Sequence, residues 1–468
     1  MEREILTTHR KALKVNLNDT VYGSFAEIGG GQEVARCFFQ AGGASGTVAK
    51  TMSAYDMAFS DNIYGCSVSR RYVSKDRLEQ MLDYEYNQVT SILSDKRSEV
   101  TRFFGFANTV ATLNFKKDNE SHGWIGMKFQ LKAGGEANMV LLHVRLLEND
   151  NLAQQLTLGV LGVNLIFACF NFHDRPNTFL QSLLDNLSTD RVEINMIQMS
   201  GEELSYVDNR LLSVQLVKNG MTRATMFDRF GNVQQPADML YKKNILVLRG
   251  SFRPITSVGF DMLKTSYGLF KKDEDHEKDR TFTFCEMTLN NLLDEGNLDE
   301  RDFLDRVDLL NGMGQNVMIT NFKEFYKLVD HLHKYSVMNL RIIIGVLAFR
   351  KVLDPSYYND LPGGVLEAFG RLFARNMKLY LYPTRHEESG KIVTSENISV
   401  PESAQHLYQH LLANRKILDI PNVNESKLHI RSSEVLELIC KGDSGWEEMV
   451  PNYVSRIIKS KQLFASNF

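Results

Sequence analysis

The stretch ILVLRGSFRPITSVGFDML, residues 245–263, decides the fold of the second half of the chain. Its four leading apolar residues predict a short buried strand. Gly-Ser-Phe-Arg-Pro predicts a tight loop, and the apolar spacing that follows predicts a helix. A helix that begins directly after a strand leaves its first N–H groups unpaired, and these groups attract an anion. Arg249 and Arg253 add positive charge, although the same spacing also fits an ordinary turn with exposed arginines.

Further strands are expected at regular intervals after this stretch. Residues 281–287, 316–320, 340–346 and 377–383 are largely apolar runs, and segments with helical spacing separate them. This alternation predicts an α/β fold in which a parallel sheet is covered on both faces. Ligands bind such sheets beyond the carboxyl ends of the strands, so the loop after residue 249 is the expected ligand site.

The first 240 residues mix helix and strand patterns without this alternation. We expect an α+β domain of unassigned type over residues 1–240 and an α/β domain over residues 241–468. The uncharged segment 156–172 contains two glycines and two asparagines and is short for a membrane span. We therefore expect it to form a buried helix.

The composition is that of an ordinary globular protein. The chain has 468 residues, of which 43% are hydrophobic and 24% charged, and its formal net charge is −3. This charge gives no indication of a nucleic-acid or anionic-membrane partner. The five cysteines have neither metal nor redox spacing, which indicates reduced thiols. We expect a cytoplasmic homo-oligomer that binds neither nucleic acid nor membrane and has no metal site.

Three ordered segments carry a resemblance to a known family. GSFRPITSVGFDM (250–262) resembles the first motif of the nicotinate-mononucleotide and phosphopantetheine adenylyltransferases, Gly-(Ser/Thr)-Phe-(Asp/Asn)-Pro-x-(His/Thr)-x-Gly-His. RIIIGVLAF (341–349) resembles their Phe-Ile-Ile-Gly-Ala-Asp strand, and IRSSEVL (430–436) is similar to their closing Ile-Ser-Ser-Thr-x-x-Arg motif. The resemblance implies a parallel, Rossmann-like nucleotidylyltransferase sheet in the carboxyl half.

Four polar positions of the family pattern are changed in this chain. Arg253 stands at the Asp/Asn position, Gly259 at the second histidine, Leu347 at the aspartate and Leu436 at the closing arginine. Losing one preorganised charge-stabilising group commonly lowers the rate by about 10²–10³. The resemblance therefore implies a nucleotide or phosphate site with little ordinary turnover. If the protein is active, the implied reaction is adenylyl transfer to a mononucleotide, with ATP and Mg²⁺ as cofactors.

The implied ligand is a nucleotide or another phosphate-containing small molecule, which would lie between the starts of two helices. No catalytic residue is assigned. The expected binding residues are Arg249, Gly250, Ser251, Phe252, Arg253, Thr256, Arg431, Ser432 and Ser433. The alternative is a non-catalytic, self-assembling structural or regulatory protein built on a retired nucleotide-binding fold.

A second glycine-rich stretch lies near the amino terminus, FAEIGGGQEVARCFFQAGGASGTVAK (25–50). AEIGGG after a strand is similar to the glycine loops of nucleotide-binding α/β folds, but it lacks their spaced fingerprint. We expect tight turns that allow close packing. The alternative is another anion site, for which Lys50 and Thr51 would be the nearest polar partners.

Overall fold

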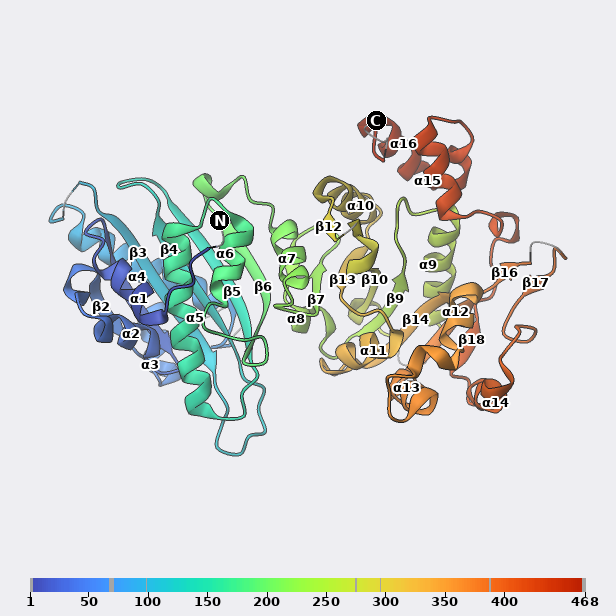
Figure 1. Cartoon of the computed structure of the whole chain (residues 1–468), viewed down its shortest axis with the longest axis horizontal. Coiled ribbons are helices and arrows are strands. Elements are labelled where there is room, and N and C mark those ends of the chain that lie inside the picture. Colours follow the sequence, from blue (N-terminus) through green and yellow to red (C-terminus); the bar gives the residue numbers. More distant parts are fainter. Residues whose placement is uncertain are drawn as a thin grey trace. The chain divides into compact units, whose positions relative to one another are not determined.

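The computed structural model describes residues 3–66, 71–97, 99–273, 276–294, 296–386 and 389–464 (Figure 1). The chain forms two compact units, Met1–Thr222 and Arg223–Phe468. Their boundary precedes the expected one at residue 240, because the strand that begins at Ala224 pairs within the second sheet.

The first unit combines helices with a six-stranded mixed sheet of order β2-β1-β3-β4-β5-β6. Its strands are β1 (Val21–Ile28), β2 (Val48–Met52), β3 (Arg102–Ala111), β4 (His122–Gln130), β5 (Ala137–Leu146) and β6 (Val192–Ser200). Its helices are α1 (Thr8–Asn16), α2 (Glu33–Ala41), α3 (Met57–Tyr64), α4 (Lys75–Leu93), α5 (Asn151–Asn171), α6 (Pro176–Leu183) and α7 (Asn209–Lys218). Strand β1 is parallel to β2 and β3, whereas β3 to β6 run antiparallel in chain order.

Helices cover both faces of this first sheet. Alternating residues of a strand point to opposite faces. Phe104 and Phe106 join the core formed with α1, α2 and α5, and Gly105 lies against α4. A Cβ at Gly105 would be 3.0 Å from the backbone nitrogen of Tyr86 on α4, so glycine allows the helix to approach the strand closely.

The apolar segment expected as a buried helix is confirmed as one. It lies in α5, which begins after Asp150, whose carboxylate accepts a hydrogen bond from the backbone nitrogen of Ala153 at 2.8 Å. Among the described helices, α5 has the length and composition that could cross a membrane, but 72% of its most apolar window is buried inside the protein.

A buried ion pair joins α1 to the chain after α6. Nζ of Lys11 lies 2.7 Å from Oδ2 of Asp185, and the two side chains are 1% and 3% exposed. The ammonium also donates to Oδ1 of Asn164 at 2.7 Å, and the Asp185 carboxylate also accepts from Arg3. These partners satisfy charges that the apolar core could not otherwise hold.

The second unit is built on an eight-stranded sheet of order β18-β15-β14-β9-β10-β13-β7-β8. Its strands are β7 (Ala224–Phe227), β8 (Val233–Gln234), β9 (Asn244–Arg249), β10 (Thr281–Thr288), β13 (Asn316–Thr320), β14 (Asn339–Gly345), β15 (Met377–Tyr382) and β18 (Ile417–Asp419). Two separate hairpins pair β11 (Leu293–Asp294) with β12 (Asn297–Leu298) and β16 (Thr384–Arg385) with β17 (Ile392–Val393). The helices are α8 (Pro236–Leu240), α9 (Ser257–Phe270), α10 (Glu300–Gly312), α11 (Phe325–His333), α12 (Val346–Val352), α13 (Gly364–Leu372), α14 (Gln405–Ala413), α15 (Ser432–Lys441) and α16 (Asn452–Lys461).

The strands from β18 to β13 are parallel, which confirms the α/β architecture expected for this half. Only β7 and β8, at one edge, are antiparallel among the described strands of this sheet. The parallel strands follow the chain from β9 to β10 and β13 in one direction, and from β14 to β15 and β18 in the other. The strand order therefore reverses between β9 and β14, and the crevice beyond their carboxyl ends is the switch point of the sheet.

Removing the Asp185 carboxylate should leave the Lys11 ammonium buried without its counter-charge. We expect Asp185→Ala to lower the free energy of unfolding by about 3–5 kcal/mol in urea titrations. Glu4→Ala is the matched control, since the Arg10–Glu4 pair is 3.6 Å long and both side chains are more than 60% exposed. The control should change stability by less than about 1 kcal/mol. Equal effects of the two substitutions would contradict a stabilising role for the buried pair.

Candidate functional site at the carboxyl edge of the second sheet

The loop after β9 has the local structure that the sequence predicts. Strand β9 ends at Arg249, and α9 begins at Ser257 after the N-cap residue Thr256. Oγ1 of Thr256 accepts a hydrogen bond from the backbone nitrogen of Gly259 at 3.3 Å. The threonine hydroxyl thereby satisfies one of the unpaired N–H groups at the start of the helix.

The Arg249 guanidinium is held by a buried carboxylate of the neighbouring strand. Its Nε and Nη2 atoms lie 2.5 Å and 2.9 Å from the two carboxylate oxygens of Glu286 on β10, which is fully buried. Nη1 donates to the backbone oxygen of Lys323 at 2.9 Å, and the guanidinium carbon lies 4.3 Å from the ring centre of Phe325. Oγ1 of Thr320 donates to Glu286 at 2.5 Å. All three guanidinium nitrogens of Arg249 thus have partners within the protein.

Helix α10 anchors the rest of the loop. Nε of Arg253 lies 2.8 Å from a carboxylate oxygen of Asp302, which also pairs with Arg306. Nη1 of Arg306 donates to the backbone oxygen of Ser251 at 3.2 Å. Phe252 is buried and adopts a left-handed backbone conformation, with φ of 49°. Arg249 is therefore paired with its own carboxylate, Glu286, whereas Arg253 shares the Asp302 carboxylate with Arg306.

The chain just before α15 meets the start of α9. Nζ of Lys427 donates to Oγ of Ser257 at 3.2 Å, and the backbone nitrogen of Asn424 donates to the Asp261 carboxylate at 3.0 Å. The contacts with α9 thus come from Asn424 and Lys427, which precede the predicted site residues Arg431, Ser432 and Ser433. Ser432 and Ser433 are exposed in the first turn of α15, whereas Arg431 is half-buried.

An apolar cavity of about 280 Å³ lies at the switch point between β9 and β14. Arg249 and Lys323 lie at its polar side, together with Glu324 and Lys351. Its apolar walls are formed by Met262, Phe325, Ile343, Ile344, Ala348, Val352, Tyr357 and Tyr358. Glu324 pairs with Lys327 at 2.9 Å, so part of the charge at this cavity is already balanced.

A second cavity, of about 500 Å³, lies on the other side of α12, and we name it the cationic cavity. Figure 1 shows α12 beside the β16–β17 hairpin, and both elements line it. Its described lining is Val346, Leu347, Arg350, Thr384, Arg385, His386, Val393, Asn397, Ile398, Ser399 and Arg431. Three arginines and no carboxylate are present among these described residues. Glu387 and Glu388 follow His386 in the sequence and lie outside the described residues.

Sequence reasoning singled out one of these three arginines, Arg431, and missed Arg350 and Arg385. Arg350 lies on α12 and Arg385 on β16, each directly after a different parallel strand. Their convergence is a consequence of the parallel sheet, which brings the residues after β14 and β15 to one edge. The only available signal was that both follow a predicted strand within a few residues.

The amino-terminal glycine stretch forms tight turns, as expected. A Cβ at Gly29 would lie 2.1 Å from the backbone oxygen of Val110, and one at Gly30 would lie 2.7 Å from Leu158. The first N–H groups of α2 are occupied by Glu27, whose carboxylate accepts from the backbone nitrogens of Ala35 at 2.9 Å and Val34 at 3.3 Å. Burial raises the pKa of Glu27 to about 7.

Lys50, the polar partner proposed for an anion at this stretch, is paired within the protein. Its ammonium lies 2.7 Å from the fully buried carboxylate of Glu85. Within the described ranges, no group of three or more His, Cys, Asp or Glu side chains has an arrangement that could hold a metal ion.

Neither the family models nor the curated proteins match this chain. Solved structures that are similar to part of it include the competence/damage-inducible protein CihA from Agrobacterium tumefaciens, with 16% identity and a TM-score of 0.26 over 36% of this chain and 98% of that chain. A CinA superfamily protein from Enterobacter cloacae has 10% identity and a TM-score of 0.27 over 36% and 95%. A candidate nicotinate-nucleotide adenylyltransferase from Vibrio parahaemolyticus has 11% identity and a TM-score of 0.24 over 48% and 97%. TM-scores this low support no argument about a shared activity.

These comparisons correct the family identification made from the sequence. The similar structures are mostly competence/damage-inducible proteins, so the identification as an adenylyltransferase-like protein is wrong. The expected adenylyl transfer and the alternative of a retired nucleotide fold are wrong with it, since both rested on that identification. The motif misled because Arg249 and Arg253, read as phosphate ligands, have carboxylate partners that the motif does not include.

Replacing Arg249 should act on stability. We expect Arg249→Met to lower the free energy of unfolding by about 3–5 kcal/mol, because it leaves the Glu286 carboxylate buried and unpaired. Chemical denaturation of the variant checks this. Arg249→Met combined with Glu286→Leu should recover most of the loss, since neither charge then remains. A single variant as stable as the parent protein would contradict the structural role of the pair.

Proposed function

We propose that the second unit binds a small oxyanion-bearing metabolite, such as a compound with a phosphate or two carboxylates, in the cationic cavity. The observation that carries this proposal is the convergence of Arg350 and Arg385 on one cavity whose described lining has no carboxylate. The cavity volume of about 500 Å³ suits a small molecule.

The chemistry of the cavity favours an oxyanion with several acceptor atoms. Arg350 and Arg385 both line this cavity, and two guanidinium groups that share a cavity repel one another unless a negative charge lies between them. Each guanidinium presents a planar fork of donors that matches a carboxylate or a phosphate. The hydroxyls of Thr384 and Ser399 and the amide of Asn397 add uncharged partners for the remaining oxygens.

The position of the cavity in the fold supports the same conclusion. Doubly wound sheets of the Rossmann type bind ligands in the crevice beyond the carboxyl ends of their parallel strands. The residues after β14 and β15 supply Arg350 and Arg385, so the cavity lies at that edge.

Pyrophosphate is a suitable probe for the cationic cavity. We expect the parent protein to bind it in isothermal titration calorimetry at fixed ionic strength. Arg350→Ala and Arg385→Ala should each weaken binding by about 10- to 100-fold, since a hydrogen bond to a charged group contributes about 1.5–3 kcal/mol.

Arg280→Ala is the matched control for these variants. Arg280 belongs to the same unit, is about half exposed and pairs with Glu277 at 3.3 Å, outside the cavity. This variant should bind pyrophosphate like the parent protein. The proposal is overturned if the parent protein does not bind the probe, or if all three substitutions weaken binding equally.

A further inference from the structure

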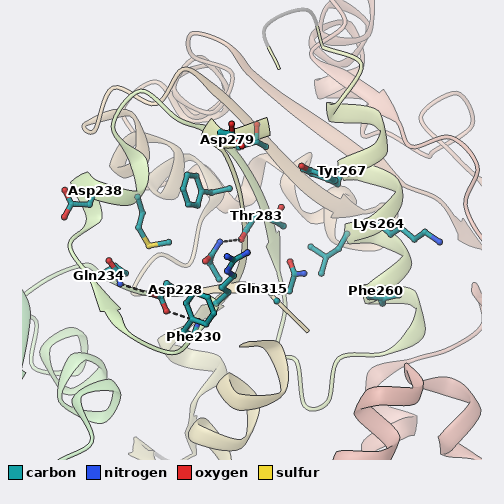
Figure 2. A pocket seen from close by; sticks show the side chains of 17 residues that line it. Asp228, Phe230, Gln234, Asp238, Phe260, Lys264, Tyr267, Asp279, Thr283 and Gln315 are labelled. Atoms are coloured by element: carbon teal, nitrogen blue, oxygen red, sulfur yellow. Dashed lines mark hydrogen bonds between the residues drawn. The ribbon is translucent and has the colours of Figure 1, made fainter. Parts of the chain in front are cut away.

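A larger cleft lies at the opposite, amino-terminal edge of the second sheet (Figure 2). Its floor includes Thr281 and Asn316, the first residues of the parallel strands β10 and β13. One wall is α9 and the other is the β7–β8 hairpin with α8. Its volume is about 850 Å³, and its residues are distinct from those of the cationic cavity. The residues of this cleft therefore form a site that the proposed function does not use.

Aromatic side chains are exposed on both walls of this cleft. Phe230, at the turn between β7 and β8, is 73% exposed, and Phe260 on α9 is 41% exposed. Both rings line the cleft, together with the half-buried rings of Tyr267 and Phe282. Apolar rings in a concave, otherwise polar surface mark a ligand site more often than single exposed residues on a convex surface do.

The turn that carries Phe230 is held by hydrogen bonds. The Asp228 carboxylate accepts from the backbone nitrogens of Phe230 at 2.8 Å and Asn232 at 2.9 Å, and from Nε2 of Gln234 at 2.8 Å. The side chain of Asn311 on α10 donates to the backbone oxygen of Asp228 at 2.9 Å. A ring fixed in this way loses little conformational entropy when a ligand stacks on it.

The polar groups of the cleft present hydrogen-bond acceptors. The side-chain nitrogens of Gln234, Gln315 and Asn316 donate to protein oxygens, at 2.8, 3.3 and 3.0 Å. Within the described part of the chain their carbonyl oxygens have no such partner and remain acceptors. In Figure 2 the charged ends of Asp238 and Lys264 point outward at opposite margins, and Gln315 and Thr283 lie between them. Asp228, Arg229 and Asp279 also line the cleft, and the guanidinium carbon of Arg229 lies 4.9 Å from the ring centre of Phe230. The cleft thus combines amide acceptors with charged groups of both signs.

From these features we propose that the cleft binds a planar heteroaromatic compound that carries amino donors at its edge. The exposed phenylalanine rings offer faces on which such a ring stacks. The carboxamide oxygens accept from its amino groups, as Asn and Gln side chains do when they hydrogen-bond to the edges of nucleobases. The ligand class follows from this combination of flat apolar faces and unpaired acceptors, and it is independent of the oxyanion proposed for the other edge.

Adenine and hypoxanthine are matched probes, since the amino donor of the first is replaced by an oxo acceptor in the second. We expect the full-length protein to bind adenine at least about tenfold more tightly than hypoxanthine in calorimetry. Phe230→Ala should weaken adenine binding by about tenfold, because loss of a stacking ring has effects of this size. Gln315→Leu tests the acceptor role separately: it removes the carboxamide oxygen, and the preference for adenine over hypoxanthine should fall.

Phe115→Ala is the control for the aromatic substitution. Phe115 is fully exposed in the first unit, so its removal should leave adenine binding unchanged. Circular dichroism would confirm that each variant is folded. Failure of the parent protein to bind adenine, equal affinity for both probes, or equal loss with Phe115→Ala would each overturn the proposal. Pyrophosphate binding at the other edge should be unaffected by Phe230→Ala.

Discussion

The fully buried carboxylate of Glu286 determines what the carboxyl edge of the second sheet can bind. It lies beside Arg249 in the register of two parallel strands, takes two hydrogen bonds from that guanidinium, and accepts a third from Thr320. Removing either partner would leave an isolated charge in a core that cannot solvate it. The arginine at the end of β9 is therefore a structural residue of the sheet, and the loop after it is held in place by α10.

The sequence places the loop of an anion site and the positive charge for that anion in one stretch. The pairing of Arg249 with Glu286 separates the two in the structure. The Gly-Ser-Phe-Arg-Pro loop has the strand, the turn and the capped helix of an anion site. Arg249, however, is paired with Glu286, and Arg253 is held by Asp302, which also pairs with Arg306. Arg350 on α12 and Arg385 in the β16–β17 hairpin lie further along the same edge and line a cavity with no carboxylate among its described residues. We infer that an anion binds at that cavity and not at the switch-point loop.

The sequence predicted local structure well and tertiary pairing poorly. The strands β9, β10, β13, β14 and β15 were predicted close to their observed bounds, because each is a short apolar run between helical segments. Thr256, which the sequence predicts as a binding residue, is the N-cap of α9, a role that depends only on neighbours in sequence. Glu286, by contrast, was only one residue in a strand pattern, and its partner Arg249 is 37 residues away. Arg350 and Arg385 were missed because the local sequence pattern does not indicate which loops become neighbours at the edge of a parallel sheet.

One measurement tests the central claim directly. Crystals of the full-length protein would be soaked in tungstate, an oxyanion whose tungsten atom can be located by anomalous diffraction. The account predicts an anomalous peak in the cationic cavity among Arg350, Arg385 and Arg431, with the Arg249–Glu286 pair intact. A peak at the loop between Gly250 and Thr256, with Arg249 turned away from Glu286 and toward the anion, would contradict it.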